Sequence, residues 1–314
     1  MEKIDKQPQV LVLVGPTAIG KTALSLLLAR HFNCEIVSVD SMQVYRYMDI
    51  GTAKASAEER RVVPHHLIDV VDPDEDYDAA RFVADAQRLI HEITMRDKMP
   101  LLTGGTGLYL KSLIEGIFPE APADKNIRDQ LKKRLENEGC DVLYEELLSC
   151  DCISAHKIHK NDSQRLLRAL EVYHLTGIPW SSHLLQQKKQ GPGGLCADIL
   201  QIGLTCNREK LYQRINMRCE IMVESGLEKE VVGLLDMGFS PELKAMGAIG
   251  YRHMIGYLDG LYNKEEMLRL LARDTRHYAK RQYTWFNRNE NIEWVDVKNQ
   301  DVVPGMVEKW QRKG

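Results

Sequence analysis

A glycine-rich segment close to the N-terminus constrains the fold of this chain more than any other feature. Residues 15–22 read Gly-Pro-Thr-Ala-Ile-Gly-Lys-Thr, between the apolar run Val10–Val14 and an apolar stretch that starts at Lys21. A strand, the pattern Gly-x4-Gly-Lys-Thr and a helix, in that order, are typical of a phosphate-binding loop. Glycines at the two fixed positions let the backbone approach a phosphate without a Cβ in the way. The pattern therefore predicts an α/β protein that binds a di- or triphosphate.

The loop itself supplies the candidate diphosphate ligands. Its backbone N–H groups converge on phosphate oxygens at the positive end of the helix. The Lys21 side chain brings a positive charge to the terminal phosphate, and the Thr22 hydroxyl is placed to ligate Mg²⁺. The predicted diphosphate-binding residues of the loop are Gly15, Pro16, Thr17, Ala18, Ile19, Gly20, Lys21 and Thr22.

Strands and helices alternate along the rest of the N-terminal part. Leu101–Thr103 is an apolar run that ends at the segment Gly104-Gly-Thr-Gly107, and Ala79–Arg96 has the spacing of an amphipathic helix. Such alternation predicts a parallel sheet with helices on its faces. The other strands expected are Ile36–Val39, a short one within His65–Val71, Ile199–Thr205 and Ile292–Val295.

The pattern changes in the middle of the chain, where the sequence is helical and polar between Pro- and Gly-rich boundaries. One helix is expected to follow the N-cap Asp124, and another to run from the N-cap Asp162 to Gly177. We therefore predict an α/β fold with a P-loop NTPase-like parallel sheet core and an inserted all-helical subdomain. The core comprises residues 1–122 and 195–314, and the insertion residues 123–194.

Composition indicates a globular protein. Hydrophobic residues make up 44% and charged residues 28% of the 314 positions, which excludes a disordered or fibrous chain. Apolar stretches are too short to span a bilayer, and the N-terminal residues lack the apolar core of a signal peptide. We expect a cytoplasmic monomer that does not associate with membranes and whose seven cysteines are reduced.

Basic residues gather in two segments although the net charge is −3. Residues 156–189 hold six Lys and Arg against two acidic residues, and residues 273–288 hold five against one. Two interpretations of these clusters are open at this point: solvated helix faces, or a localised contact with a polyanion such as RNA.

Asp40 is the candidate catalytic carboxylate. It follows an apolar strand directly, and ligands of open α/β sheets bind at the carboxyl ends of the strands. A carboxylate there could hold Mg²⁺ or act as the general base on an acceptor, whereas the alternative is a turn or helix-cap residue. Thr106, in the glycine-rich segment at the same edge, could hold a phosphate oxygen or an acceptor amine, or could simply belong to a turn.

Two enzyme classes are excluded by missing motifs. The chain has no Asn-Lys-x-Asp of the kind that reads guanine in GTPases, and no His-x-Glu with Cys-x-x-Cys of the zinc deaminases.

Taken together, the motifs resemble those of the tRNA dimethylallyltransferases, also called tRNA isopentenyltransferases. The resemblance covers nearly the whole chain, in order, and one departure is visible: the family loop usually reads GPTASGKT, whereas Ile19 replaces the serine here. The segments that carry it are GPTAIGKT (15–22), DSMQVYRYMDIGTAK (40–54), HHLIDV (65–70), GGTGLY (104–109), NDSQRLLRALEV (161–172), GYR (250–252) and AKRQYTWF (279–286).

The resemblance implies a reaction in which dimethylallyl diphosphate alkylates N6 of the adenosine immediately 3′ of the anticodon, in tRNAs that read codons beginning with U. It implies that Asp40 accepts the proton of the amine and that Thr106 positions the amine or a diphosphate oxygen. Mg²⁺ is the implied cofactor, and Arg214 and Arg218 are further candidate diphosphate ligands.

The implied macromolecular partner is the anticodon stem-loop of tRNA, whose target base must leave the stack to react. Met42, Gln43 and the Tyr45 ring are expected to frame that base, whereas Trp285 and Phe286 are expected to pack in the core. Tyr251 could serve either role. The predicted tRNA-binding residues are Asp40, Ser41, Met42, Gln43, Thr106, Arg128, Gln164, Arg165, Arg168, Gly250, Tyr251 and Arg252.

Two other functions compete with this interpretation. In a small-molecule or nucleotide kinase, Asp40 would activate a hydroxyl and the insertion would be a lid. In a non-enzymatic RNA-binding switch, a bound nucleotide would control RNA affinity and no covalent product would form.

Overall fold

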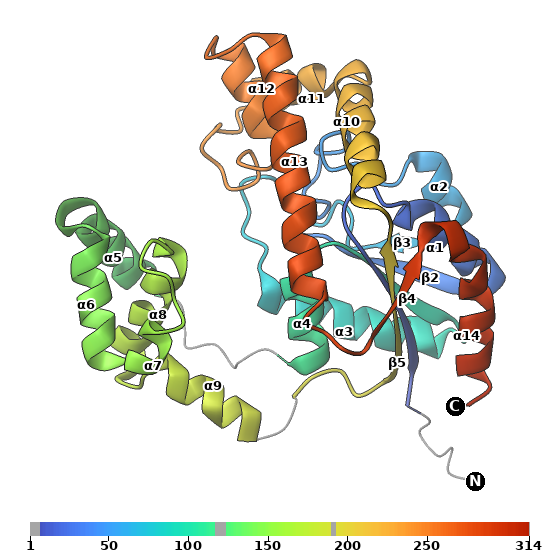
Figure 1. Ribbon diagram of the computed structural model, residues 1–314, viewed down its shortest axis with the longest axis horizontal. Helices are drawn as coiled ribbons and strands as arrows, with labels where there is room; N and C mark the ends of the chain where they lie inside the picture. Colours follow the sequence, from blue (N-terminus) through green and yellow to red (C-terminus); the bar gives the residue numbers. More distant parts are fainter. Residues whose placement is uncertain (1–6, 117–123, 190–192, 314) are drawn as a thin grey trace. The chain divides into compact units, whose positions relative to one another are not determined.

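A computed structural model of the chain describes residues 7–116, 124–189 and 193–313 (Figure 1). The chain forms two compact units. One combines residues 1–113 with 196–314, and the other comprises residues 114–195, which include the predicted insertion.

The first unit is built on a six-stranded, all-parallel sheet with the strand order β3-β2-β4-β1-β5-β6. Parallel strands are covered on both faces, and β1 is accordingly an almost unbroken apolar run that is buried along nearly its whole length. The strands are β1 (Gln9–Val14), β2 (Cys34–Val39), β3 (His65–His66), β4 (Met99–Gly104), β5 (Asp198–Thr205) and β6 (Ile292–Asp296).

Strand register brings the functional segments to one edge of the sheet. Gly104 pairs with Val14 of β1 and with Val39 of β2, so the last residues of three neighbouring strands are level. The phosphate-binding loop, Asp40 and Thr106 each follow one of these strand ends. The parallel pairing therefore gathers three segments that lie far apart in the sequence.

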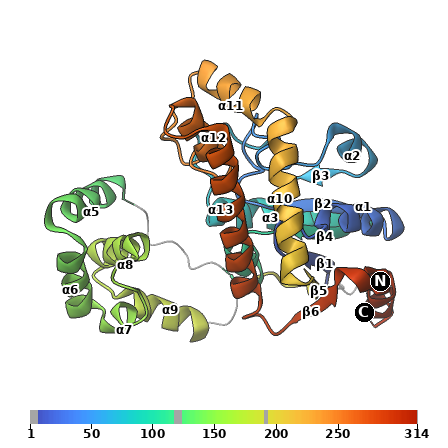
Figure 2. The same cartoon turned by 45° about the horizontal axis from the view of Figure 1, so that its top comes forward.

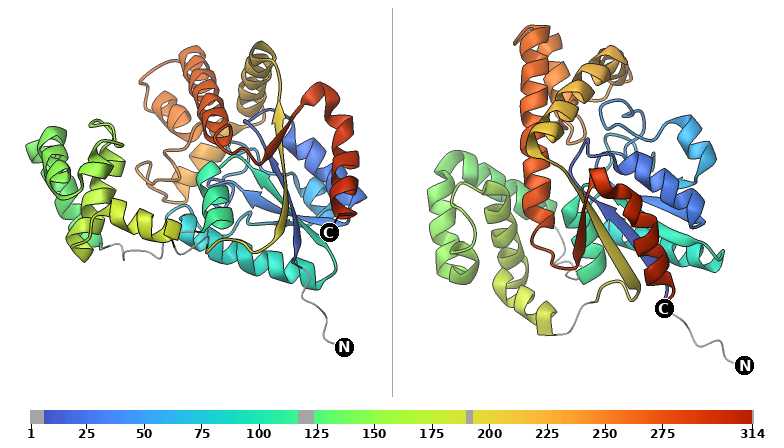
Figure 3. Two further views of the ribbon diagram at one scale, coloured as in Figure 1. Left: turned by 60° about the horizontal axis from the view of Figure 1, so that its bottom comes forward. Right: turned by 45° about the vertical axis from the view of Figure 1, so that its right-hand side comes forward.

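Helices cover both faces of this sheet. Right-handed crossovers place the helix after β1 and the helix after β3 on opposite faces, because the two connections run in opposite directions along the sheet. On one face α1 (Lys21–His31) lies beside α14 (Val303–Gln311), as Figure 3 shows, and His31 pairs with Glu308. On the other face α3 (Ala79–Met95) packs against α4 (Gly107–Glu115) through the stacked Phe82 and Tyr109 rings.

A group of helices lies past the carboxyl ends of the strands (Figure 1). Within it α10 and α13 run side by side (Figure 2) and are joined by hydrogen bonds from Arg276 to Asn216 and from Cys219 to Thr275. The helices are α10 (Arg208–Glu224), α11 (Leu227–Asp236), α12 (Tyr251–Leu258) and α13 (Lys264–Phe286). They add walls to the sheet edge where the three functional segments meet.

The second unit is helical throughout its described residues. Asp124 and Asp162 cap the N-termini of α5 and α8, and both helices end at glycines, as the sequence predicted. Leu131, Leu166 and Leu170 belong to its separate apolar core. Near its ends, a side chain on Gly194 would overlap the Ile114 carbonyl, so the two connecting segments touch. Its helices are α5 (Lys125–Glu138), α6 (Cys140–Cys150), α7 (Cys152–Ala155), α8 (Ser163–Thr176) and α9 (Trp180–Lys189).

Most predicted elements are confirmed, including the short strand within residues 65–71. The strand expected within 65–71 covers only His65–His66, because Leu67 and Asp69 adopt positive φ angles of 60° and 57°, which break the extended conformation. Val71 then forms a single bridge to Tyr45. None of the helices in the described part of the chain is both long and apolar enough to cross a membrane.

Candidate active site

The phosphate-binding loop joins β1 to α1 with the backbone geometry that its glycines allow. Gly15 and Gly20 have φ angles of 147° and 111°, and a Cβ on Gly15 would lie 2.9 Å from the Leu204 carbonyl oxygen. The Lys21 ammonium donates hydrogen bonds to the carbonyls of Gly15 at 2.8 Å and Pro16 at 2.9 Å. The lysine is therefore held over its own loop.

The surroundings of Lys21 disfavour the charged form of its side chain. Burial and the nearby Arg218 guanidinium lower the pKa of Lys21 to about 7, and the Asp40 carboxylate opposes this shift. An anion in the cavity would favour the charged form. The pocket is thus suited to a group that carries negative charge, such as a diphosphate.

Asp40 sits at the end of β2, where its carboxylate organises the following turn. Its Oδ1 accepts hydrogen bonds from the N–H groups of Met42 at 2.8 Å and Gln43 at 3.3 Å. Thr106, in the segment that follows β4, fixes the same turn, because its Oγ1 accepts a hydrogen bond from the Ser41 N–H at 3.0 Å. The two predicted catalytic residues therefore hold one short segment, residues 41–43, between them.

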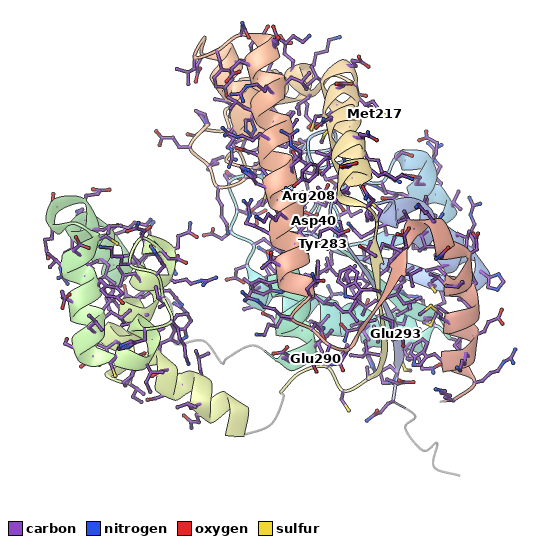
Figure 4. The ribbon with its side chains drawn as sticks, viewed as in Figure 1. Asp40, Arg208, Met217, Tyr283, Glu290 and Glu293 are labelled. Carbon is purple, nitrogen blue, oxygen red and sulfur yellow. The ribbon has the colours of Figure 1, made fainter. Side chains whose placement is uncertain are left out.

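A cavity of about 520 Å³ opens beside these residues. Figure 4 labels Asp40 near the sheet edge and Met217 on α10, and both side chains line the cavity. The lining includes Thr17, Ala18, Ile19, Gly20, Lys21, Thr22, Asp40, Gln43, Arg214, Arg218, Tyr278 and Gln282. Phosphate-binding groups and a carboxylate thus share one space, and neither Ser41, Met42 nor Thr106 belongs to its lining.

Two arginines of α10 also line the cavity. Arg214 donates from Nε to the Ala18 carbonyl at 2.8 Å, which ties α10 to the phosphate-binding loop. Arg218 lines the cavity, and burial lowers the pKa of its guanidinium. Both predicted diphosphate ligands therefore lie where an anion held by the loop would meet them.

Ile19, the departure from the usual loop sequence, is only 1% exposed. Its Cγ2 would lie 3.3 Å from a Cβ on Gly15, so the side chain packs beneath the loop. The substitution exchanges a hydroxyl for apolar packing and leaves the loop backbone in place.

Sequence reasoning missed Tyr278 and Gln282, which reach the cavity from α13. Gln282 accepts a hydrogen bond from the Thr17 N–H at 2.8 Å and donates one to the Gly105 carbonyl at 3.0 Å. Burial together with the Asp40 charge raises the pKa of the Tyr278 phenol. Their spacing of one helical turn, inside or beside the segment 279–286, was the only signal in the sequence.

The sequence matches two family models, one described as IPP transferase over residues 43–289 and one as isopentenyl transferase over residues 8–70. The chain belongs to the IPP transferase family. This confirms the resemblance noted from the motifs and the α/β fold class that it implied.

Relatives of this transferase cover almost its full length. It is 57% identical over 310 residues to the tRNA dimethylallyltransferase of Desulfotalea psychrophila, covering 99% of this chain and 97% of the relative. It is 45% identical over 309 residues to that of Desulfosudis oleivorans, covering 98% of each. These similarities support the prenyltransferase interpretation and not the kinase alternative.

Two solved structures share the fold. The tRNA isopentenylpyrophosphate transferase of Bacillus halodurans matches with a TM-score of 0.69 and 40% identity, over 98% of this chain and 99% of that one. A eukaryotic dimethylallyltransferase described as acting on tRNA matches with a TM-score of 0.77 and 31% identity. That match covers 92% of this transferase and 74% of the other chain.

In the transferase the motif Gly250-Tyr251-Arg252 has a structural role. Tyr251 is fully buried and donates a hydrogen bond to Glu230 at 2.5 Å, so it belongs to the core, which is one of the two roles that the sequence left open. The Glu230 carboxylate also accepts the N–H groups of residues 49–51 at 2.7 to 3.0 Å. Gly250, with φ 102°, is buried too, and only Arg252, which pairs with Asp274, is exposed.

The expected frame for the target base is only partly present. Tyr45 is 1% exposed and belongs to the core, so it does not face the cavity. Gln43 lines the cavity, but its amide donates to the Thr52 and Ala53 carbonyls and accepts from Ser38. Phe286 is buried and the Trp285 ring packs against Gly107, which confirms that these two aromatics are packing residues.

The remaining candidates lie in the second unit, on α5 and α8. Gln164 and Arg165 are exposed, and Arg165 lies 3.4 Å from Asp162. Arg128 and Arg168 both pair with the buried Glu171. Leu166 and Leu170 face the core, as the sequence predicted, and so the polar residues of α8 lie on a separate face.

Proposed function

We propose that this enzyme transfers a dimethylallyl group from dimethylallyl diphosphate to N6 of the adenosine that follows the anticodon, in tRNAs reading codons that begin with U. One observation carries the proposal: the phosphate-binding loop and the Asp40 carboxylate line the same cavity. A leaving group and a proton acceptor are thereby available within one space. Relatives named tRNA dimethylallyltransferase support the same reaction.

The proposed step is a single displacement. The N6 lone pair forms a bond to C1 of the dimethylallyl group, the C1–O bond breaks, and its electron pair leaves with diphosphate. Asp40 accepts the proton released from N6, which is the role of a general base. The loop N–H groups, Lys21, Arg214 and Arg218 stabilise the charge that develops on the departing diphosphate.

Magnesium fits the oxygen donors of this site. The Thr22 hydroxyl and the Asp40 carboxylate line one cavity together, and Mg²⁺ is usually held by one or two protein oxygens together with substrate phosphates. Thr22 would hold the ion against the diphosphate. When bound, Mg²⁺ offsets negative charge on the diphosphate.

The acceptor is proposed to be tRNA, whose adenosine must be extruded to reach Asp40. A eukaryotic relative with the same fold is described as acting on tRNA. Arginines that stack on unpaired bases and bind phosphates are typical of single-stranded RNA recognition, and Arg128, Arg165 and Arg168 supply them on the second unit.

The test is the reaction itself. Purified protein is incubated with dimethylallyl diphosphate, Mg²⁺ and an anticodon stem-loop RNA with adenosine after the anticodon, and the digested nucleosides are analysed by mass spectrometry. We expect N6-dimethylallyladenosine, and none when that adenosine is replaced by guanosine. Phosphate transfer from ATP without prenylation would instead indicate a kinase, and ATP-dependent RNA binding without any product a non-enzymatic switch.

A further inference from the structure

A buried carboxylate joins two arginines in the helical unit. Glu171 of α8 has a side chain that is only 2% exposed. Its Oε2 accepts a hydrogen bond from Nη2 of Arg128 at 3.1 Å and from Nη1 of Arg168 at 2.9 Å. Arg128 belongs to α5 and Arg168 to α8, so one oxygen atom links two helices.

The carboxylate depends on these arginines. Its other oxygen, Oε1, is buried and has no hydrogen-bond partner among the residues that the structure describes. A buried carboxylate that lost its ion pairs would carry an uncompensated charge, which is strongly unfavourable. Glu171 therefore holds both guanidinium groups in place.

The arginines themselves remain accessible. Their side chains are 47% exposed for Arg128 and 33% for Arg168. Each guanidinium has five N–H donors in a planar fork, which is more than one carboxylate oxygen can accept. The cluster presents two planar cations that are both tied to the same carboxylate oxygen.

We infer that Glu171 is a positioning residue for RNA: it orients Arg128 and Arg168 before the anticodon stem-loop binds. This inference rests on the proposed function. A free arginine loses rotamer freedom when it binds a phosphate or stacks on a base, whereas one already held by a carboxylate loses less. Glu171 thus increases tRNA affinity although its own charge repels phosphate.

The variant Glu171→Gln keeps the shape and removes the charge. We expect the KM for tRNA to rise about tenfold, as for the loss of two pre-ordered side chains, with the kcat at saturating tRNA and the KM for dimethylallyl diphosphate unchanged. Glu138→Gln is the matched control, because Glu138 pairs with Arg134 on α5. An unchanged tRNA KM in Glu171→Gln, with wild-type activity established, would overturn the inference.

A variant that lacks both arginines separates a positioning role of Glu171 from a general effect on protein stability. If Glu171 acts through the arginines, Glu171→Gln should have little further effect on the tRNA KM in a protein that already carries Arg128→Ala and Arg168→Ala. An equal loss in both backgrounds would show that the residue acts otherwise. Absence of prenylation by the wild-type protein would refute the proposed function instead.

The charge-preserving variants Arg128→Lys and Arg168→Lys cover the case in which Glu171→Gln does not fold. Lysine keeps the charge but lacks the planar fork, so we expect a raised tRNA KM. A tRNA KM equal to that of the wild type in both lysine variants would contradict the fixed guanidinium geometry.

Discussion

Gln282 and Gly105 are in direct contact: the Gln282 amide nitrogen lies 3.0 Å from the Gly105 carbonyl oxygen, and a Cβ on Gly105 would overlap it. The same amide group accepts the N–H of Thr17 from the phosphate-binding loop. One side chain of α13 therefore sets the distance between the loop after β1 and the loop after β4.

Replacing Gln282 with leucine should misalign these two loops. Small displacements of groups around a reacting centre reduce rates strongly, so we expect kcat/KM for dimethylallyl diphosphate to fall about 10- to 100-fold. Steady-state prenylation assays measure this. Gln213→Leu, on the exposed side of α10, is the control, and equal kinetics in the two variants would contradict the role of Gln282.

The variant Asp40→Asn removes the proton acceptor and keeps the geometry of the turn. Asparagine retains an oxygen that can accept the N–H groups of Met42 and Gln43, but it cannot take the N6 proton. We expect kcat to fall about 10²- to 10⁴-fold, the usual effect of losing a general base, with tRNA affinity nearly unchanged. A kcat within a few fold of the wild-type value would contradict the general-base role and would show that Asp40 only stabilises the turn.

Diphosphate binding should depend on pH through Lys21. With a pKa of about 7 in the free protein, Lys21 is charged below pH 7 and increasingly neutral above it, whereas bound diphosphate favours the charged form. Binding above pH 7 therefore takes up a proton, and affinity falls as the pH rises. Calorimetry in buffers of different ionisation enthalpy measures the uptake. The variant Lys21→Met should lose this proton uptake, because methionine cannot be protonated. A proton uptake equal to that of the wild type would contradict the role of Lys21.

Glu230→Gln should loosen the segment 49–51. Its carboxylate accepts three backbone N–H groups and the Tyr251 hydroxyl, and an amide with one acceptor oxygen cannot satisfy them all. We expect a loss of about 1–3 kcal/mol in the free energy of unfolding, measured by urea denaturation. Glu228→Gln on the same helix is the control, and equal stabilities would show that the N–H groups find other partners.

Acid should remove the stabilisation that Glu35 provides. Despite burial, hydrogen bonds from Arg96, His66 and Lys98 lower the pKa of Glu35 to about 2, against an ordinary value of 4.5. Its contribution to stability is therefore complete above pH 4.5 and is lost as the pH falls towards 2. Urea unfolding of wild type and Glu35→Gln should differ at pH 7 and converge near pH 2. A constant difference would contradict this assignment.

The sequence was sufficient for those parts of the site that depend on local pattern. The phosphate-binding loop could be predicted because strand, glycines, lysine and helix follow one another within fourteen residues, Gln9 to Thr22. Asp40 could be placed because the ends of parallel strands meet at one edge. Helix caps such as Asp162 have local causes too, and these predictions agree with the structure.

Contacts between distant segments could not be predicted in this way. Gln282 and Thr17 are separated by 265 residues, and nothing in the spacing of α13 shows which of its residues reaches the loop. Tyr45 and Tyr251 lie in motifs that also hold exposed polar residues. Their burial results from packing against elements elsewhere in the chain, such as α11, which supplies Glu230.

The touching ends of the helical unit have a consequence for the order of folding. β5 pairs with β1 across a sequence separation of 189 residues between Gln9 and Asp198, and closing a longer loop costs more entropy. Because the segments at Ile114 and Gly194 touch, a folded insertion shortens the effective loop by almost its own length. We expect the folded insertion to speed the pairing of β5 with β1. Leu170→Ala, which weakens only the core of the insertion, should therefore slow this pairing in stopped-flow refolding.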